Sequence, residues 1–433
     1  MSRHDGRMPI RGLRLGVMLA LGTGAGCASS RDPADWVSVR EVTPPFLLRL
    51  SATDPAITAD DRGRVALTFV TRDSAGRDLW LSVSRDSGFR FTTPVRVNSR
   101  PGSVASYPEG RPIAVFGPGG ALAVAWAERR GDGTRAVDLV VRASGDGGAS
   151  LGPAVVVNDD RGPPGARRQA TSGSAGVRGF PGLAFLPNGS LFATWLDERH
   201  AVAGPEQPTI SSLYAALSRD GGQSWSRNIS VADSACACCR PLAVTDPFGR
   251  IAIAYRSGAG NLRDPALAVS FNGGASFALH TLVSPDGWYL EGCPDQGPAL
   301  TWNLRGGGRY AWYTESGEPG VYIVPWQEDH GAAGVKRAMS DSVSGARRPR
   351  LAALGSTALL AVEARSVPDS SRGVIAVRAI DEDGTLTAWS FLGADAEAAW
   401  IAGLDQRTAL ACWVERGGEK PWVRVARLRR NRG

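Results

Sequence analysis

Apolar and polar residues alternate along most of the chain, and the alternation comes in pairs of short segments separated by a polar turn. A period of two places side chains on opposite faces of a β-strand, so each pair predicts two antiparallel strands joined by a turn. Seven such pairs follow one another, at residues 56–69, 111–126, 180–195, 240–255, 297–313, 348–364 and 398–414. The pattern predicts an all-β chain built from seven similar units.

A polar octet follows each of the first four strand pairs. It reads SRDSGFRF from Ser84, SGDGGASL from Ser144, SRDGGQSW from Ser218 and SFNGGASF from Ser270. Each octet lies between two further β-rich segments, which predicts a hairpin turn in which Asp or Asn bonds backbone N–H groups and Gly takes a positive φ. The third position is occupied by Asp86, Asp146, Asp220 and Asn272. We interpret these four side chains as structural.

The octets and their spacing resemble the Asp-box, or BNR, repeats of the sialidase-like β-propeller superfamily. They begin 60, 74 and 52 residues apart, which is the spacing of propeller blades. The resemblance implies an all-β propeller of four-stranded antiparallel blades. We count seven blade units, with six as the alternative because sialidases have six blades. Residues 36–42 precede the first unit, and we expect them to close the ring by pairing with the last unit, which lacks a clear fourth strand.

The turns of a propeller blade alternate between the two faces of the ring. The octets, as turns between the third and fourth strands, all belong to one face. The loops between the second and third strands, and the crossovers from one blade to the next, belong to the other face. Binding and catalytic residues lie most often on loops that a rigid scaffold positions, so we expect function on the face opposite the octets.

Residues 1–27 have the pattern of a secretory signal, with four arginines, a short apolar run from Leu15 to Gly22, and small residues before Cys27. The ending TGAGC resembles a bacterial lipobox, although Gly24 stands where Leu is usual, and ordinary signal cleavage is the alternative. We expect an exported lipoprotein, anchored to a membrane through Cys27 and facing the periplasm or the cell exterior. A tether at 28–35, a single propeller at 36–428 and a basic tail at 429–433 would follow.

The formal net charge of +7 does not indicate a nucleic-acid-binding protein. Residues 1–27 carry +3 and residues 426–433 carry +4, so the remainder of the chain is formally neutral. Binding to phosphate backbones needs a concentrated basic field. We therefore expect no nucleic-acid partner, and a glycan or another cell-surface ligand instead.

Four cysteines fall on crossovers of the predicted functional face. Cys236, Cys238 and Cys239 precede the fourth unit and Cys293 precedes the fifth, so the four should lie together near the central channel. In an exported chain the first expectation is a disulfide, for example between Cys293 and one member of the triplet. The alternative is a soft-metal site of thiolates for Cu(I) or Zn. Cys412 alternates with apolar residues in a predicted strand and is expected in the core.

Three arginines, Arg111, Arg240 and Arg348, precede a Pro at the start of a unit's first strand. Sialidase-like sites hold a sugar carboxylate with three arginines, because a guanidinium group matches a carboxylate bidentately. The resemblance implies this role for the trio. The alternative is that Arg-Pro marks the start of a strand and leaves the guanidinium at a solvated rim. The order at 111–113 is Arg-Pro-Ile, whereas the superfamily usually has Arg-Ile-Pro.

Sialidases use a Tyr activated by Glu in place of a nucleophilic carboxylate, because a neutral nucleophile suits an anionic sugar. Tyr313 and Glu315 end a strand of the fifth unit and are the candidates for this pair, with Tyr255 as a rival. The candidate acids are Asp197, Glu198, Asp264 and Glu291. The other interpretation of YAWYTE, at 310–315, is an ordinary strand with alternating aromatic residues.

The fourth and fifth units also carry the segments CACCRP, NLRDPALAVSFNGGASF and DGWYLEGCPDQGPAL. These segments resemble uncharacterised bacterial BNR-repeat proteins more closely than true sialidases. We therefore predict a propeller that binds a glycan, a protein or a metal. The alternative is a sialidase-type glycoside hydrolase that acts on terminal acidic sugars. Apart from the soft metal at the cysteines, no cofactor is expected.

Overall fold

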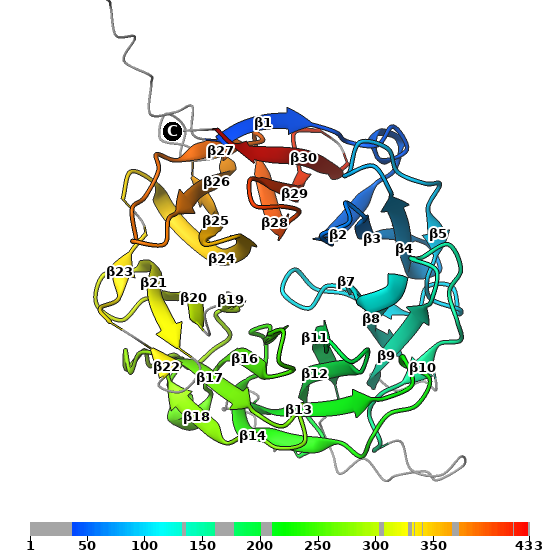
Figure 1. Ribbon diagram of the computed structural model, residues 1–433, viewed down its shortest axis with the longest axis horizontal. Coiled ribbons are helices and arrows are strands. Elements are labelled where there is room, and N and C mark those ends of the chain that lie inside the picture. Colours follow the sequence, from blue (N-terminus) through cyan, green and yellow to red (C-terminus); the bar gives the residue numbers. More distant parts are fainter. Residues whose placement is uncertain are drawn as a thin grey trace, which may run out of the picture. The chain divides into compact units, whose positions relative to one another are not determined.

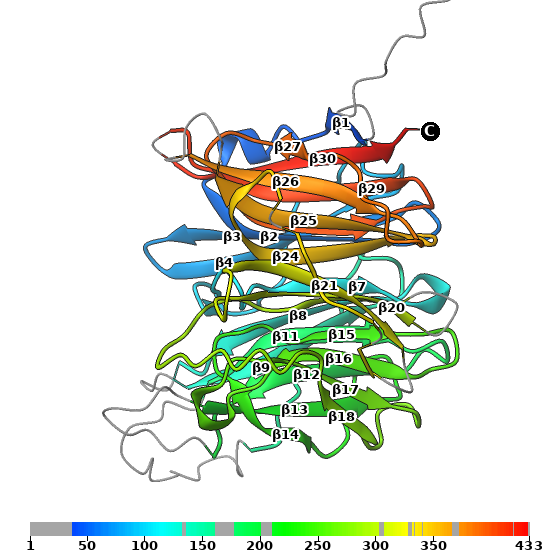
Figure 2. The same ribbon diagram turned by 90° about the vertical axis from the view of Figure 1, so that its left-hand side faces the viewer.

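The computed structural model describes residues 37–131, 136–160, 177–200, 210–302, 307–327, 331–332, 334–339, 341–365, 372–418 and 420–431. These described residues all belong to one compact unit. Seven antiparallel sheets stand around a central axis in the order of the sequence (Figure 1). Seen from the side, the strands run across the thickness of the ring, from one face to the other (Figure 2).

The first four blades carry the octets in their last turn. Blade 1 contains β2 (Ala52–Ala59), β3 (Val65–Asp73), β4 (Gly76–Ser84) and β5 (Val95–Arg96). Blade 2 contains β6 (Val104–Ala105), β7 (Ile113–Phe116), β8 (Leu122–Arg129), β9 (Val137–Ser144) and β10 (Val155–Val156). Blade 3 contains β11 (Arg178–Phe185), β12 (Leu191–Asp197), β13 (Ile210–Ser218) and β14 (Ile229–Cys236). Blade 4 contains β15 (Leu242–Thr245), β16 (Ile251–Arg256), β17 (Pro265–Ser270) and β18 (Leu279–Leu282).

The last three blades have the same strand order without an octet. Blade 5 contains β19 (Ala299–Trp302), β20 (Gly307–Thr314), β21 (Gly320–Gln327), β22 (Gly331–Ala332) and β23 (Arg337–Ala338). Blade 6 contains β24 (Ser344–Leu354), β25 (Thr357–Arg365), β26 (Gly373–Ile380) and β27 (Ser390–Leu392). Blade 7 contains β28 (Ala396–Gly403), β29 (Thr408–Glu415), β30 (Trp422–Arg430) and β1 (Val37–Glu41).

The ring closes through the two ends of the described chain. Strand β1 pairs antiparallel with β30, with Val37 opposite Arg430, and so supplies the outer strand of blade 7. The predicted seven blades and this closure are confirmed, and the six-blade alternative is wrong. Strand β30 continues through Arg429 and Arg430, because its residues still find partners on β1 there. These two arginines therefore belong to the propeller, whereas we had assigned them to a tail.

The core is a ring of apolar clusters between blades. Seven clusters each join mainly two neighbouring blades, and together they include the joint between blades 7 and 1. Trp126, Trp195, Trp312 and Trp326 are among their largest fully buried side chains. Full burial of a side chain such as Leu or Phe contributes about 1.5–3 kcal/mol, so the contacts between neighbouring blades stabilise the ring.

The four octets share one hydrogen-bonding pattern at the turn between the third and fourth strands. In the octet of blade 3, the Ser218 hydroxyl donates to Asp220 at 2.7 Å and accepts from the Gly222 N–H at 2.7 Å. The Asp220 carboxylate also accepts from the Ser224 N–H at 2.9 Å. Gly222 has φ 95°, and a Cβ there would lie 3.3 Å from the Cβ of Ala143 in blade 2. We call the side of the ring with these turns the octet face and the opposite side the crossover face.

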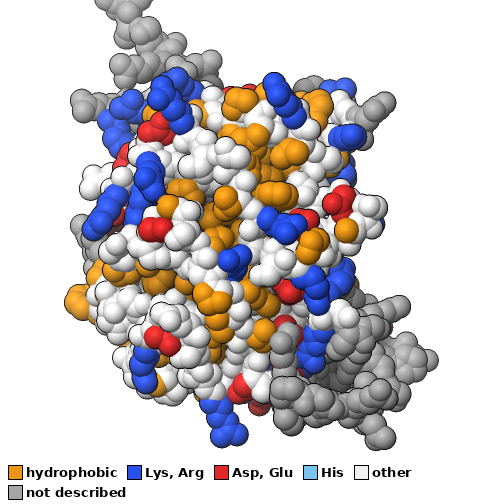
Figure 3. Space-filling view, turned by 90° about the vertical axis from the view of Figure 1, so that its right-hand side faces the viewer, with side chains coloured by type: hydrophobic (Ala, Val, Ile, Leu, Met, Phe, Trp, Pro, Cys, Tyr) orange, Lys and Arg blue, Asp and Glu red, His pale blue; other side chains and the backbone are white. Residues whose placement is uncertain are grey.

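The outer edge of blades 1 and 2 faces the viewer in Figure 3, where apolar side chains occur in patches between arginines. A groove of about 680 Å³ on blade 1 is lined by Phe46, Leu50, Trp80 and Pro94, among others. The helical segments in the described part of the chain are three-residue 3-10 turns, and none is long or apolar enough to cross a bilayer.

Candidate functional site

The crossover face carries a cluster of arginines at the centre of the ring. Arg111, Arg240 and Arg350 are buried, and their guanidinium carbons lie 5.3, 5.0 and 5.0 Å from the ring centroid of Trp400. The first two precede β7 and β15, and the third lies within β24. A guanidinium over an indole ring is attracted by the negative face of the aromatic system. Trp400 of blade 7 thus lies close to arginines from blades 2, 4 and 6.

Glu109 supplies the negative charge of this cluster. Its carboxylate accepts a hydrogen bond from Arg350, lies 3.8 Å from the Arg240 Nε, and accepts the Gly297 N–H at 2.9 Å. Burial alone would raise the pKa of Glu109, but the attraction of Arg350, Arg240 and Arg111 lowers it to about 2. The carboxylate therefore stays ionised at neutral pH and neutralises part of the buried positive charge.

The arginine cluster joins the backbones of different blades. Arg111 donates from Nη1 to the carbonyls of Pro55 and Ala398, both at 2.8 Å, and so links blade 2 to blades 1 and 7. Its Nε and Nη2 donate to the Pro108 carbonyl. Arg240 donates to the Pro298 carbonyl at 3.1 Å, and burial together with the nearby Arg350 lowers its pKa to about 9. Arg111 therefore uses its guanidinium donors in bonds to backbone carbonyls and is fully buried.

Arg348 is not a member of the central cluster. Its guanidinium pairs with Asp295 at 2.5 Å and with Glu363 at 3.1 Å, and its N–H donates to Gln296. The register of β24 shifts between Arg347 and Arg350, which turns these nearby arginines in different directions. The three arginines that we expected to grip one carboxylate therefore do not converge. Arg350 occupies the place that we had expected for Arg348.

A small polar cavity opens between blades 6 and 7 on the crossover face. Its volume is about 180 Å³, and its lining includes Arg347, Glu363, Arg365, Asp395 and Glu397. The Arg347 side chain is 47% exposed and lies 3.4 Å from Glu363 through its Nε. Charged residues from three strands and a turn therefore line one small space.

The Tyr313 and Glu315 side chains meet at the end of β20. The Tyr313 hydroxyl donates to the Glu315 carboxylate at 2.9 Å, and the Trp288 ring packs edge-on against Tyr313 at 5.7 Å. Burial, and then Glu315, raise the pKa of Tyr313 to about 12, while Arg347 acts in the opposite direction. Tyr313 therefore lies within electrostatic reach of an arginine that lines the polar cavity.

The other candidates are spread over different blades. Asp197 is buried in blade 3, where its carboxylate accepts from Trp195 and Arg199, both at 2.7 Å. Glu291 is exposed on the crossover to blade 5 and accepts a hydrogen bond from Tyr289.

The remaining candidates are Tyr255, Glu198 and Asp264, and each is packed or hydrogen-bonded within the protein. Burial raises the pKa of Tyr255, which packs in the cluster between blades 3 and 4. Glu198 accepts the Val177 N–H, and Asp264 accepts the Trp288 N–H, both at 3.2 Å.

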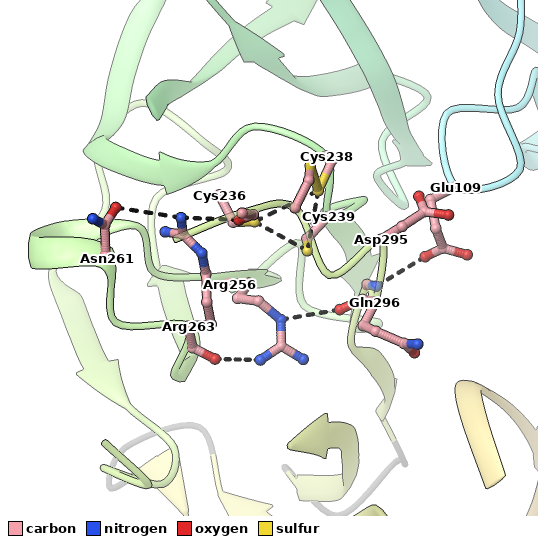
Figure 4. The surroundings of a disulfide bond; sticks show 12 residues. Glu109, Cys236, Cys238, Cys239, Arg256, Asn261, Arg263, Asp295 and Gln296 are labelled. Atoms are coloured by element: carbon pink, nitrogen blue, oxygen red, sulfur yellow. Dashed lines mark hydrogen bonds between the residues drawn. A yellow bond between two sulfur atoms is a disulfide. The ribbon is translucent and has the colours of Figure 1, made fainter. Parts of the chain in front are cut away.

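The four cysteines of the crossovers lie together, and Figure 4 shows Cys236, Cys238 and Cys239 around the disulfide to Cys293. Cys238 and Cys293 form a disulfide, and Cys236 and Cys239 are buried free thiols. The sulfur atoms of Cys236, Cys238 and Cys239 lie within 4.8 Å of one another, a spacing that could hold a metal ion. Because Cys238 is in the disulfide, two thiols remain for a soft metal here, and the metal site stays a prediction. Cys412 is buried in β29, and burial raises its pKa to about 12.

Three residues of the central cluster, Glu109, Arg350 and Trp400, were not predicted from the sequence. Glu109 and Trp400 carry no motif, and their partners lie in other blades. In the sequence, Arg348 and Arg350 both lie at the start of the same predicted strand. The register shift in β24 that separates their side chains cannot be recognised from the residue pattern. Cys27, the expected lipidation site, and the tether lie outside the described residues.

No family model and no curated protein matches the chain. Solved structures do match it. A protein of unknown function from Dyadobacter fermentans is 15% identical, with 92% of this chain and 100% of that one covered and a TM-score of 0.53. An ulvan lyase bound to a GlcA–Rha3S unit is 10% identical, with 87% and 93% covered and a TM-score of 0.54. An α-L-arabinofuranosidase of Fusarium graminearum with arabinobiose is 14% identical, with 80% and 98% covered and a TM-score of 0.51.

These identities are low, and the likenesses show a shared fold alone. The predicted β-propeller fold is thereby confirmed.

Proposed function

We propose that the protein is an exported, lipid-anchored propeller that binds a glycan on its crossover face, at the cavity between blades 6 and 7. The observation that carries this proposal is the convergence of Arg347, Arg365, Glu363, Asp395 and Glu397 on one cavity. Guanidinium and carboxylate groups donate and accept paired hydrogen bonds, and such pairs match the neighbouring hydroxyl groups of a sugar ring. The shared fold with glycan-active propellers is consistent with this use of the scaffold.

A panel of immobilised oligosaccharides tests the binding site. The panel should contain sulfated, uronic-acid, sialylated and neutral members, with calorimetry on the best of them. Arg347→Ala should weaken binding about tenfold, equal to about 1.4 kcal/mol. The matched control is Arg219→Ala, which lies at a cavity on the octet face and should bind normally. Equal binding by both variants, or no binding to any member of the panel, would contradict the proposal.

A second candidate is a sialidase-type glycoside hydrolase, and the hydrogen bond between Tyr313 and Glu315 favours it. In this role Glu315 would take the phenol proton as the Tyr313 oxygen attacks the anomeric carbon. The glycosidic bond from that carbon to the leaving oxygen would break, and the leaving oxygen would take a proton from solvent. A fluorogenic sialic acid conjugate tests the idea directly. Release of the fluorophore that Tyr313→Phe abolishes would support hydrolysis, whereas no release at high protein concentration would remove this candidate.

The anchoring part of the proposal rests on the sequence of residues 1–27. A cell that expresses the chain with labelled fatty acid should incorporate the label into the protein and lose it in Cys27→Ser. Normal membrane fractionation of the Cys27→Ser variant, without label in either protein, would refute the lipid anchor.

A further inference from the structure

We propose that Cys236, Cys238, Cys239 and Cys293 form a dithiol–disulfide exchange centre, in which the buried pair Cys236 and Cys239 reduces the surface disulfide Cys238–Cys293. The substrate class that this centre would serve is a disulfide of a small molecule or of another protein. This activity is independent of glycan binding, which uses other residues.

The first support is the distances between the sulfur atoms. The Sγ atoms of Cys236 and Cys239 lie 3.1 Å apart, so a small movement joins them in a bond. Cys238 Sγ lies 3.9 Å from Cys236 Sγ and 4.0 Å from Cys239 Sγ. Thiol–disulfide exchange needs a thiolate next to a disulfide sulfur, and two thiols meet that requirement at Cys238.

The second support is the gradient of exposure across the centre. Cys236 and Cys239 are buried, Cys238 is half-buried and Cys293 is exposed. The buried pair is shielded from large reagents, whereas Cys293 lies at the surface. Exchange within the centre would carry reducing equivalents from the interior to a sulfur that an external disulfide can reach.

The third support is the positive charge beside the buried pair. Arg256 and Arg263 are buried, and the guanidinium of Arg263 lies toward Cys236 in Figure 4. Arg256 donates to the carbonyls of Gln296 and Tyr313 at 3.0 and 2.8 Å, and Arg263 donates to that of Gly292 at 3.1 Å. Cys236 is therefore suited to be the attacking thiolate.

The exchange is balanced without an added oxidant. The Cys236 thiolate attacks Cys238 Sγ, the Cys238–Cys293 bond breaks, and Cys293 leaves as a thiolate that takes the proton lost by Cys236. Cys239 then attacks Cys236 Sγ in the Cys236–Cys238 bond, and Cys238 leaves as a thiolate that takes the Cys239 proton. One disulfide and two thiols enter, and one disulfide and two thiols result. The Cys293 thiolate could next attack an external disulfide RS–SR, and Cys238 would release the second RSH as Cys238–Cys293 re-forms.

Irreversible labelling of the folded full-length chain tests the exchange. The chain is incubated with a bulky maleimide and a metal chelator in the absence of reductant, and mass spectrometry locates every label and disulfide. We expect labels on Cys238 and Cys293 that accumulate together with a Cys236–Cys239 disulfide. A Cys238–Cys293 bond that stays intact and unlabelled, while the same positions are labelled after reduction, would overturn the proposal. Labels on Cys236 or Cys239 with that bond intact would overturn it equally.

Two variants identify the attacking pair. Cys239→Ser should stop the sequence halfway, with a Cys236–Cys238 disulfide and a label on Cys293 alone. Cys236→Ser/Cys239→Ser should keep Cys293 unlabelled, whereas the matched control Cys412→Ser, which removes a buried thiol of blade 7, should be labelled as the unmodified chain is. If the double variant fails to fold, the single variant and the unmodified chain still decide the outcome. Labelling of Cys293 in a folded double variant would exclude the buried pair as the source of electrons.

Discussion

The two faces of the ring satisfy their polar groups in different ways. On the octet face, Ser218, Asp220 and Gly222 bond one another within a few residues of one turn. On the crossover face, Glu109 bonds Gly297 and Arg350, which are 188 and 241 positions away in the chain. The octet turns are thus local solutions that repeat from blade to blade, and the centre of the crossover face is a single network. Damage to the network should therefore cost far more than damage to one turn.

Glu109→Gln should have the largest effect. Gln keeps the shape of the side chain but leaves Arg111, Arg240 and Arg350 without a buried negative charge, and breaking a buried ion pair costs about 3–5 kcal/mol. Chemical denaturation of the variant should show this loss of unfolding free energy. The control Glu318→Gln, at an exposed position of the same face, should change little. Equal stability of the two variants would show that the network is not held by charge.

The acid stability of the unmodified chain should depend on the same carboxylate. The pKa of Glu109 falls from a usual 4.5 to about 2 in the folded protein. A lowered pKa stabilises the folded state above about pH 4.5, and this contribution is lost as the pH falls toward 2. The linked free energy is up to about 3 kcal/mol. Denaturation measured from pH 6 to 2 should show a steeper loss for the unmodified chain than for Glu109→Gln, and parallel curves would contradict the assignment.

Gly222→Ala should have an intermediate effect on the octet face. The residue has φ 95°, and an added Cβ would approach Ala143 and Leu191 at 3.3 and 3.4 Å. A non-glycine residue in this conformation costs about 1–2 kcal/mol. Gly417→Ala is the matched control, because its Cβ meets no atom within 4 Å. A loss as large as that of Glu109→Gln would remove the contrast between the faces.

Asn272→Asp should have the smallest effect. Asn272 already accepts the Ser276 N–H at 2.9 Å and the Ser270 hydroxyl at 3.0 Å, as Asp does in the other octets. The Ser276 hydroxyl can turn from accepting the Asn272 amide to donating to a carboxylate. Thermal unfolding should give a melting temperature close to that of the unmodified chain. A marked drop would show that blade 4 depends on the amide.

The difference between the faces also explains what the sequence could predict. Strand pairs and octets are periodic, so seven blades, their order and the closure by residues 37–41 follow from the pattern. Proximity of Cys293 to the triplet follows from the ring order, but the choice of Cys238 as its partner depends on side-chain geometry. Glu109, Arg350 and Trp400 meet only because distant blades converge at the axis. A register shift in β24 separates Arg348 from Arg350, and it cannot be predicted from the residue pattern.

The pairing of β1 with β30 closes the ring. The Ser38 hydroxyl donates to the Arg429 carbonyl across 391 positions of the chain. The first strand of the propeller therefore cannot pair until the last strand has formed. The entropic cost of closing so long a loop grows only with the logarithm of its length, but contacts between such distant residues form slowly. Until β1 and β30 pair, each of these two strands exposes an unpaired edge and blade 7 is incomplete. While the ring is open, these edges can associate with the edges of other chains.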